Sequence, residues 1–132
     1  MALKQVKDRY EFREYRHATS ILVASFPNET IELCDALMRF HITEKEIKAS
    51  GGNESAIPKK MSAMLRPLDW KEKKLEAKLT VAEGNDSKNV ETVSSETHKI
   101  DYIKGKVAFD LEWNAKDQTF DRDLYAFRTF FE

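Results

Sequence analysis

The chain has 132 residues, which is the length of one domain or of part of one. Its hydrophobic fraction of 41%, with 8 Phe, 4 Tyr and 2 Trp, is enough for a core, and its net charge of -1 provides no overall basic field for a polyanion. The single cysteine excludes an internal disulfide and suits a reducing compartment. Because no apolar run approaches the roughly 20 residues of a membrane span, and no signal-peptide core opens the chain, we expect a soluble intracellular protein.

The first third of the chain predicts one clear helix. Residues 4–16 are charged with scattered aromatic residues and fit either a short strand or a helix. Residues 17–26 are apolar and end at Pro27-Asn28, and Asn28 is a suitable cap for the helix that follows. Its apolar positions near helical spacing are Ile31, Cys34, Leu37 and Met38. A free cysteine among apolar residues is usually buried, so we expect Cys34 in the core.

A polar loop is predicted over residues 43–55, centred on Ser50-Gly51-Gly52-Asn53. A second helix begins at Ser55 or Ala56, has Pro58 in its first turn, and is limited by Pro67. Its apolar stripe comprises Ile57, Met61, Met64, Leu65 and Leu68. Trp70, directly after this helix, is expected to be a core anchor, and a base-stacking role is the alternative.

The second half of the chain predicts mainly strands. Residues 74–81 alternate strictly, which indicates a half-buried strand with Leu75, Ala77, Leu79 and Val81 on one side. A long loop is expected over 83–96, a hairpin over 98–113, and a last amphipathic helix carrying Leu124, Phe127, Phe130 and Phe131. Because the chain stops at Glu132 inside that helix, we expect a single α+β domain over 1–132 that is the N-terminal portion of a longer protein.

The hairpin separates apolar from acidic side chains. With a two-residue turn at Lys104-Gly105, Ile103 pairs with Lys106. The apolar face then pairs Tyr102 with Val107, Ile100 with Phe109, and His98 with Leu111. On the other face Asp101 lies across from Ala108, and Asp110 is its diagonal neighbour at roughly 7–8 Å. Glu112 comes next along the same face.

Acidic side chains that converge from two adjacent strands predict a site for a hard divalent cation such as Mg²⁺. Asp101 and Asp110 would supply carboxylate oxygens, the backbone carbonyl of Leu111 another ligand, and Glu112 would hold or deprotonate a water. Such a site suits phosphodiester hydrolysis. The alternative is a solvated strand face, on which Lys99 lies opposite Asp110 and neutralises it.

The segment from Asp101 to Trp113 resembles the active-site hairpin of type II restriction endonucleases related to BglII and BstYI, which belong to the PD-(D/E)XK nuclease superfamily. Weaker similarities are Tyr15-Arg-His-Ala18, Ile21-Leu22 and Trp70-Lys71, so the resemblance covers most of 15–131. It implies a central mixed sheet that carries the acidic hairpin and is flanked by helices. It also implies a Mg²⁺-dependent homodimer that cuts specific sites in double-stranded DNA, in the cytoplasm of a bacterium or archaeon.

The resemblance assigns a role to each acid. Asp101 matches the first, metal-binding aspartate, and Asp110 matches the second acid, which is usually Glu. Glu112 matches the third position, which is Lys in the superfamily and Gln in the nearest relatives; the related BamHI also has Glu there. A gapped match would instead use Glu112 and Asn114 as the second and third positions.

Several residues are weaker candidates for DNA contacts, and a solvated surface is the alternative for all of them. The segment that begins at Lys48 resembles a Lys-Ala-Ser segment of the same family, and lysines at 59, 60, 71, 73, 74 and 78 would line a phosphate path. The specific candidates are Lys48, Ser50, Asn53, Lys59, Lys60, Asn114 and Lys116. Glu54, or Glu46 nearby, is a candidate for an additional upstream acid. Two other functions stay open: a non-catalytic DNA- or partner-binding module with the same fold, and a repair or resolvase nuclease.

Overall fold

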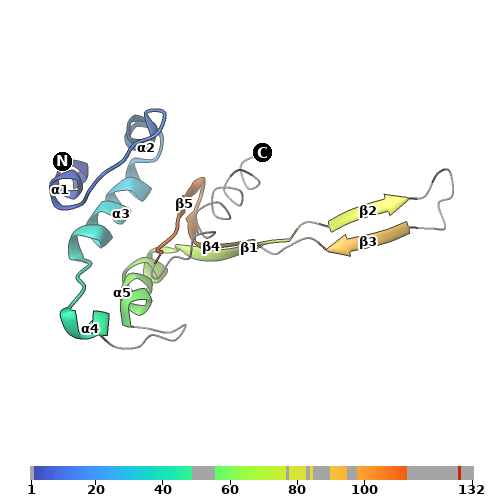
Figure 1. Ribbon diagram of the computed structural model, residues 1–132. Helices are drawn as coiled ribbons and strands as arrows, with labels where there is room; N and C mark the ends of the chain where they lie inside the picture. Colours follow the sequence, from blue (N-terminus) through green and yellow to red (C-terminus); the bar gives the residue numbers. More distant parts are fainter. Residues whose placement is uncertain are drawn as a thin grey trace. The chain divides into compact units, whose positions relative to one another are not determined.

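The computed structural model describes residues 2–48, 56–76, 78–82, 84, 90–94, 98–112 and 128. Within them the chain forms helices followed by strands, which confirms an α+β protein (Figure 1). Two compact units are present. One comprises residues 1–71 with 104–107, and the other comprises residues 72–103 with 108–132. No helix in the described ranges combines the length and the apolar character that a membrane crossing requires.

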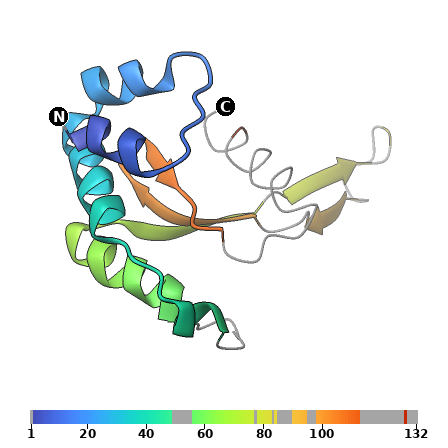
Figure 2. The same cartoon turned by 60° about the vertical axis from the view of Figure 1, so that its left-hand side comes forward.

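The first unit is helical. Its helices are α1 (Ala2–Arg9), α2 (Ala18–Ser25), α3 (Pro27–Arg39), α4 (Glu44–Lys48), α5 (Ala56–Leu65) and the 3₁₀ helix η1 (Arg66–Leu68), as Figure 2 shows from a second direction. Residues 4–16, for which the sequence permitted a strand or a helix, are helical as far as Arg9.

Helix α3 begins two residues earlier than predicted, and Asn28 does not cap it. Pro27 occupies the first helical position, and Phe26 is the residue before the helix. Proline suits this position because the first N–H groups of a helix lack intrahelical acceptors. The buried stripe also differs from the prediction, because Ile31 is 58% exposed. Cys34 is buried as expected.

Helix α4 lies inside the segment that was predicted to be a loop. Thr43 and Glu46 form a reciprocal capping box: the Thr43 N–H donates to Glu46 Oε2 at 2.9 Å, and the Glu46 N–H donates to Thr43 Oγ1 at 3.3 Å. This pair satisfies N–H groups that a helix start otherwise leaves without a partner. The Thr-Glu-Lys-Glu spacing was therefore the sequence signal for α4. Residues 50–53 lie outside the described ranges.

Helix α5 begins at Ala56 and ends before Pro67, as the sequence predicted. Three of its predicted stripe residues are buried, namely Ile57, Met61 and Leu65. Leu68 is 38% exposed because the chain changes to a 3₁₀ turn at Arg66, and this turn breaks the α-helical period. Trp70 is fully buried, which confirms it as a core anchor.

The strands are β1 (Lys71–Leu75), β2 (Lys78–Ala82), β3 (Val90–Ser94), β4 (His98–Lys104) and β5 (Val107–Phe109). They form one sheet in the order β1-β4-β5 and a separate antiparallel pair, β2-β3, in which Lys78 pairs with Ser94 and Ala82 with Val90. These described strands make up a smaller arrangement than the central mixed sheet that was expected.

Two strand predictions need correction. The single strand over 74–81 is divided between β1 and β2, and Val81 is 50% exposed because β2 pairs only with β3 in a two-stranded sheet that offers little covering surface. The loop predicted over 83–96 contains β3, whose Val-Glu-Thr-Val run has strong strand propensity. The predicted last helix lies outside the described residues except for Arg128, which is helical.

Candidate active site

The turn of the β4-β5 hairpin lies one residue later than predicted. Strand β4 continues to Lys104 and β5 begins at Val107, so the two turn residues are Gly105 and Lys106. Gly105 has a φ of 57°, a conformation that costs a glycine little and an L-residue more. A hairpin turn with glycine at its first central position is of the kind whose twist matches that of the flanking strands.

The hairpin brings Asp101 and Asp110 into contact. The backbone N–H of Asp101 donates to Asp110 Oδ1 at 2.7 Å, although Asp110 lies one residue beyond β5. The rings of Tyr102 and Phe109 also meet across the hairpin, with 5.7 Å between their centroids.

The two faces of the hairpin nevertheless keep their predicted composition. Side chains on a strand alternate between its two faces with a period of two. Ile100, Tyr102 and Val107 are buried, whereas Asp101 and Asp110 are half-buried. The acidic pair therefore lies on the less buried face.

The third predicted acid is not gathered with the pair. Glu112 is exposed, and among the residues that the structure describes no three Asp, Glu, His or Cys side chains come together in a group that could hold a metal ion. Strand β5 ends at Phe109, so strand alternation no longer dictates where Leu111 and Glu112 point. The donor set of Asp101 and Asp110 still suits Mg²⁺, which commonly takes one or two carboxylates together with waters and substrate phosphate.

Lys99 forms an ion pair with Glu72 of β1, with 3.0 Å between Nζ and Oε2. This ion pair gives Lys99 an acidic partner other than Asp110, its predicted neighbour.

Two of the predicted DNA-contacting lysines have partners within the helical unit. Lys48 pairs with Glu44 at 2.6 Å, one turn away on α4. Lys60 Nζ lies 2.5 Å from Glu46 Oε1 and donates to the His41 carbonyl at 2.7 Å. The Lys60 hydrogen bond and that of the Thr43 amide hold the pKa of Glu46 below its usual value, so Glu46 is ionised.

Of the remaining weaker candidates for DNA contacts, the structure describes one. Lys59 lies exposed on α5. The others lie outside the described residues: Ser50, Asn53, Glu54, Asn114 and Lys116.

A contact that the sequence did not indicate involves Glu32 of α3. Its carboxylate accepts hydrogen bonds from Trp70 Nε1 at 2.8 Å and from Lys104 Nζ at 2.7 and 2.8 Å, one to each oxygen. Burial alone would raise the pKa of Glu32, but the hydrogen bonds from Lys104 and Trp70 and the charge of Lys104 outweigh burial and lower it. No sequence pattern could reveal this contact, because Glu32 and Lys104 are 72 residues apart.

Glu29, one helical turn before Glu32, also lies beside the hairpin tip. A Cβ placed on Gly105 would be 3.7 Å from Glu29 Oε1. Helix α3 therefore meets the tip of the hairpin through two acidic residues.

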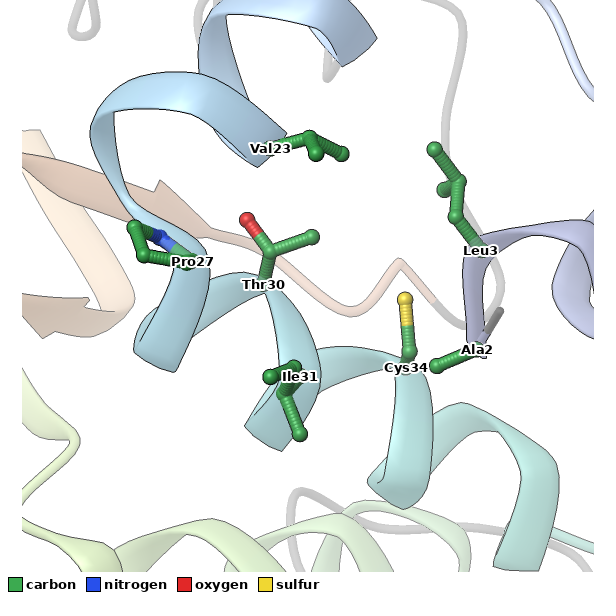
Figure 3. Close-up of a pocket in the computed structure, with 7 residues that line it drawn as sticks. All are labelled: Ala2, Leu3, Val23, Pro27, Thr30, Ile31 and Cys34. Atoms are coloured by element: carbon green, nitrogen blue, oxygen red, sulfur yellow. The ribbon is translucent and has the colours of Figure 1, made fainter.

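The helical unit also contains an apolar cavity of about 410 Å³, which is shown in Figure 3. It is lined by Ala2, Leu3, Val23, Pro27, Thr30, Ile31 and Cys34. The Thr30 hydroxyl donates to the Phe26 carbonyl at 2.7 Å, and burial raises the pKa of the Cys34 thiol. This lining has no charged group and offers no acid or base for catalysis.

Comparison with known protein families gives a match. A family model described as "Restriction endonuclease BglII/BglIII" matches residues 10–132, a span that includes β4, β5 and both aspartates. No curated protein and no solved structure matches the chain.

Proposed function

We propose, because this chain belongs to the BglII/BglIII restriction endonuclease family, that it is a Mg²⁺-dependent type II enzyme that cuts specific sites in double-stranded DNA. The observation that supports this most is the contact between Asp101 and Asp110 on the hairpin, with 2.7 Å between the Asp101 nitrogen and Asp110 Oδ1. Two carboxylate side chains on neighbouring segments of one hairpin are a suitable donor set for Mg²⁺.

In the proposed mechanism Asp101, Asp110 and the carbonyl of Leu111 would hold Mg²⁺. The chemistry supplied by a bound Mg²⁺ would be polarisation of the scissile phosphate and a lower pKa for a water. The Asp101 amide keeps one oxygen of Asp110 in a fixed position, so the shorter aspartate suits a position where the superfamily usually has glutamate. Glu112, exposed at the end of the hairpin, would accept a proton from the attacking water.

Recognition and assembly are proposed from the family as well. Site-specific cutting requires contacts to base edges in the grooves. A homodimer would place one active site on each strand of a palindrome, because the two-fold axis of the protein then coincides with that of the DNA.

Cleavage of plasmid DNA by the chain in its full natural length tests the proposal. With Mg²⁺ we expect discrete fragments, and we expect Asp101→Asn and Asp110→Asn each to slow cleavage by about 10²-fold or more, because each removes a charged metal ligand. Asp8→Asn, which changes an exposed aspartate of α1, is the matched control and should cut normally.

Three results would contradict this proposal. Cleavage that survives Asp101→Asn would remove the acidic pair from the mechanism. Binding of DNA without cleavage in Mg²⁺ or Mn²⁺ would favour a non-catalytic module. Preference for branched DNA would favour a repair or resolvase nuclease.

A further inference from the structure

Strand β4 carries a lysine at the end of its buried face. Side chains on a strand alternate between two faces, so Lys104 shares the face of Ile100 and Tyr102. Asp101 lies on the other face. Ile100 and Tyr102 are buried, and the Lys104 side chain, which continues their row, is only 27% exposed. A charge in such a position is costly unless it is paired and hydrogen-bonded.

Glu32 of α3 is the partner of this lysine. Both oxygens of Glu32 accept from Lys104 Nζ, at 2.7 and 2.8 Å, and the Glu32 side chain is only 22% exposed. Charge-assisted hydrogen bonds of this kind are among the stronger ones in proteins. The end of β4 is therefore attached to α3 by a partly buried ion pair.

The same carboxylate also holds the residue that precedes β1. Glu32 Oε2 accepts from Trp70 Nε1 at 2.8 Å, and Trp70 is fully buried. The Trp70 carbonyl accepts from the Arg66 guanidinium at 3.1 Å, which holds the backbone of Trp70 in place. Strands β1 and β4 are neighbours in the sheet. One carboxylate thus fixes the beginning of β1 and the end of β4.

The contact between the two aspartates depends on the placement of β4. Asp101 lies three residues before Lys104 on this strand, which corresponds to about 10 Å. Its N–H donates to Asp110 Oδ1 at 2.7 Å, and Asp110 lies beyond the end of β5. Hydrogen bonds weaken steeply when their distance and angle are distorted, so this contact is sensitive to a movement of β4.

We infer that Glu32 is a positioning residue that fixes the end of β4 through Lys104 and thereby keeps Asp101 in contact with Asp110. A partly buried ion pair adds little stability relative to apolar side chains of similar volume, but it gives each charged group a defined partner. The effect on cleavage rests on the proposed function, whereas the effect on the contact between the two aspartates does not.

Nuclear magnetic resonance measures this contact directly, because the Asp101 N–H is its donor. A short hydrogen bond to a carboxylate moves the amide proton signal downfield, and loss of the bond returns the signal upfield. The signal is that of the folded chain, so a variant that is merely less stable keeps it unchanged. The amide signal of Met61, in the middle of α5, verifies that each variant is folded.

The decisive variants remove the charge of one partner each. Glu32→Gln keeps an acceptor for Trp70, and Lys104→Met leaves the bond between Glu32 and Trp70 in place. In both we expect the Asp101 signal to move upfield while the Met61 signal stays. We also expect the kcat of Mg²⁺-dependent cleavage to fall by about tenfold or more with an unchanged KM for DNA, because the metal ligands are displaced. Lys104→Arg retains a two-pronged ion pair and should restore the signal and kcat.

Asp35→Asn is the matched control on the same helix. It breaks an exposed ion pair with Arg39 and should leave the Asp101 signal and the cleavage rate unchanged. If Glu32→Gln fails to fold, Lys104→Met and Lys104→Arg still provide the comparison.

The outcomes separate this inference from the proposed function. If the Asp101 signal keeps its position in both charge-removing variants, the inference is wrong even when the unmodified chain cuts DNA. If the signal moves as expected but the unmodified chain cuts no DNA, the positioning role stands and the proposed function fails.

Discussion

At the scale of single residues, Glu32 illustrates how an acid is kept ionised away from bulk water. Its pKa lies below the ordinary value of 4.5, because hydrogen bonds from Lys104 and Trp70 outweigh the effect of burial. A carboxylate with a depressed pKa stabilises the folded state fully above its unfolded pKa, and this contribution is lost as the pH falls through the folded value.

This linkage makes a prediction about acid unfolding. The free energy of unfolding of the unmodified chain should fall as the pH decreases below about 4.5, and Glu32→Gln should flatten that part of the curve while lowering stability at neutral pH. Urea unfolding at a series of pH values measures both effects. Parallel curves for the two proteins would show that Glu32 titrates alike in the folded and unfolded chain.

At the scale of elements, local chemistry explains most of the boundaries. Pro27 starts α3, the box of Thr43 and Glu46 starts α4, and Pro67 ends the α-helical geometry that precedes it. The error at α3 came from placing the cap at Asn28, and the error at α4 came from overlooking the capping box. The division of β1 from β2 has no comparable local signal.

The hairpin turn permits a test at the same scale. Gly105 has a positive φ, and a Cβ there would make only an ordinary contact with Glu29. Gly105→Ala should therefore destabilise the fold by about 1 kcal/mol through backbone strain alone. Gly105→Asn should cost less, because asparagine tolerates positive φ. Thermal unfolding of the two variants provides the measurement, and equal stability of Gly105→Ala and the unmodified chain would contradict this account.

At the scale of the whole molecule, membership of the family implies DNA binding by a chain whose net charge is only -1. Binding must then depend on local positive charge. The strand β1 carries three exposed lysines, Lys71, Lys73 and Lys74. Exposed lysines are compatible with phosphate contacts and equally with a solvated surface. The salt dependence of DNA affinity separates these alternatives.

We expect the affinity for DNA to fall steeply as the salt concentration rises. Replacing a DNA-contacting lysine of β1 with Gln should reduce the slope of log K against log salt concentration by about one. Lys45→Gln, an exposed lysine of α4, is the control and should leave the slope unchanged. Fluorescence anisotropy over a salt series measures the slopes. Unchanged slopes for Lys71, Lys73 and Lys74 would identify β1 as a solvated face.

The sequence by itself determined the helix over α5, the burial of Cys34 and Trp70, and the common face of Asp101 and Asp110. Each depends on local periodicity or on strand alternation, which are properties of neighbouring residues. It also sufficed for the family, which the match of the family model over residues 10–132 confirms.

Only the tertiary structure decided the contact between the hairpin and helix α3. The ion pair of Lys104 with Glu32 joins residues 72 positions apart, and the energy of such a contact depends on the folded arrangement alone. The hydrogen bond from the Asp101 amide to Asp110 likewise goes beyond strand alternation, because β5 ends one residue before Asp110.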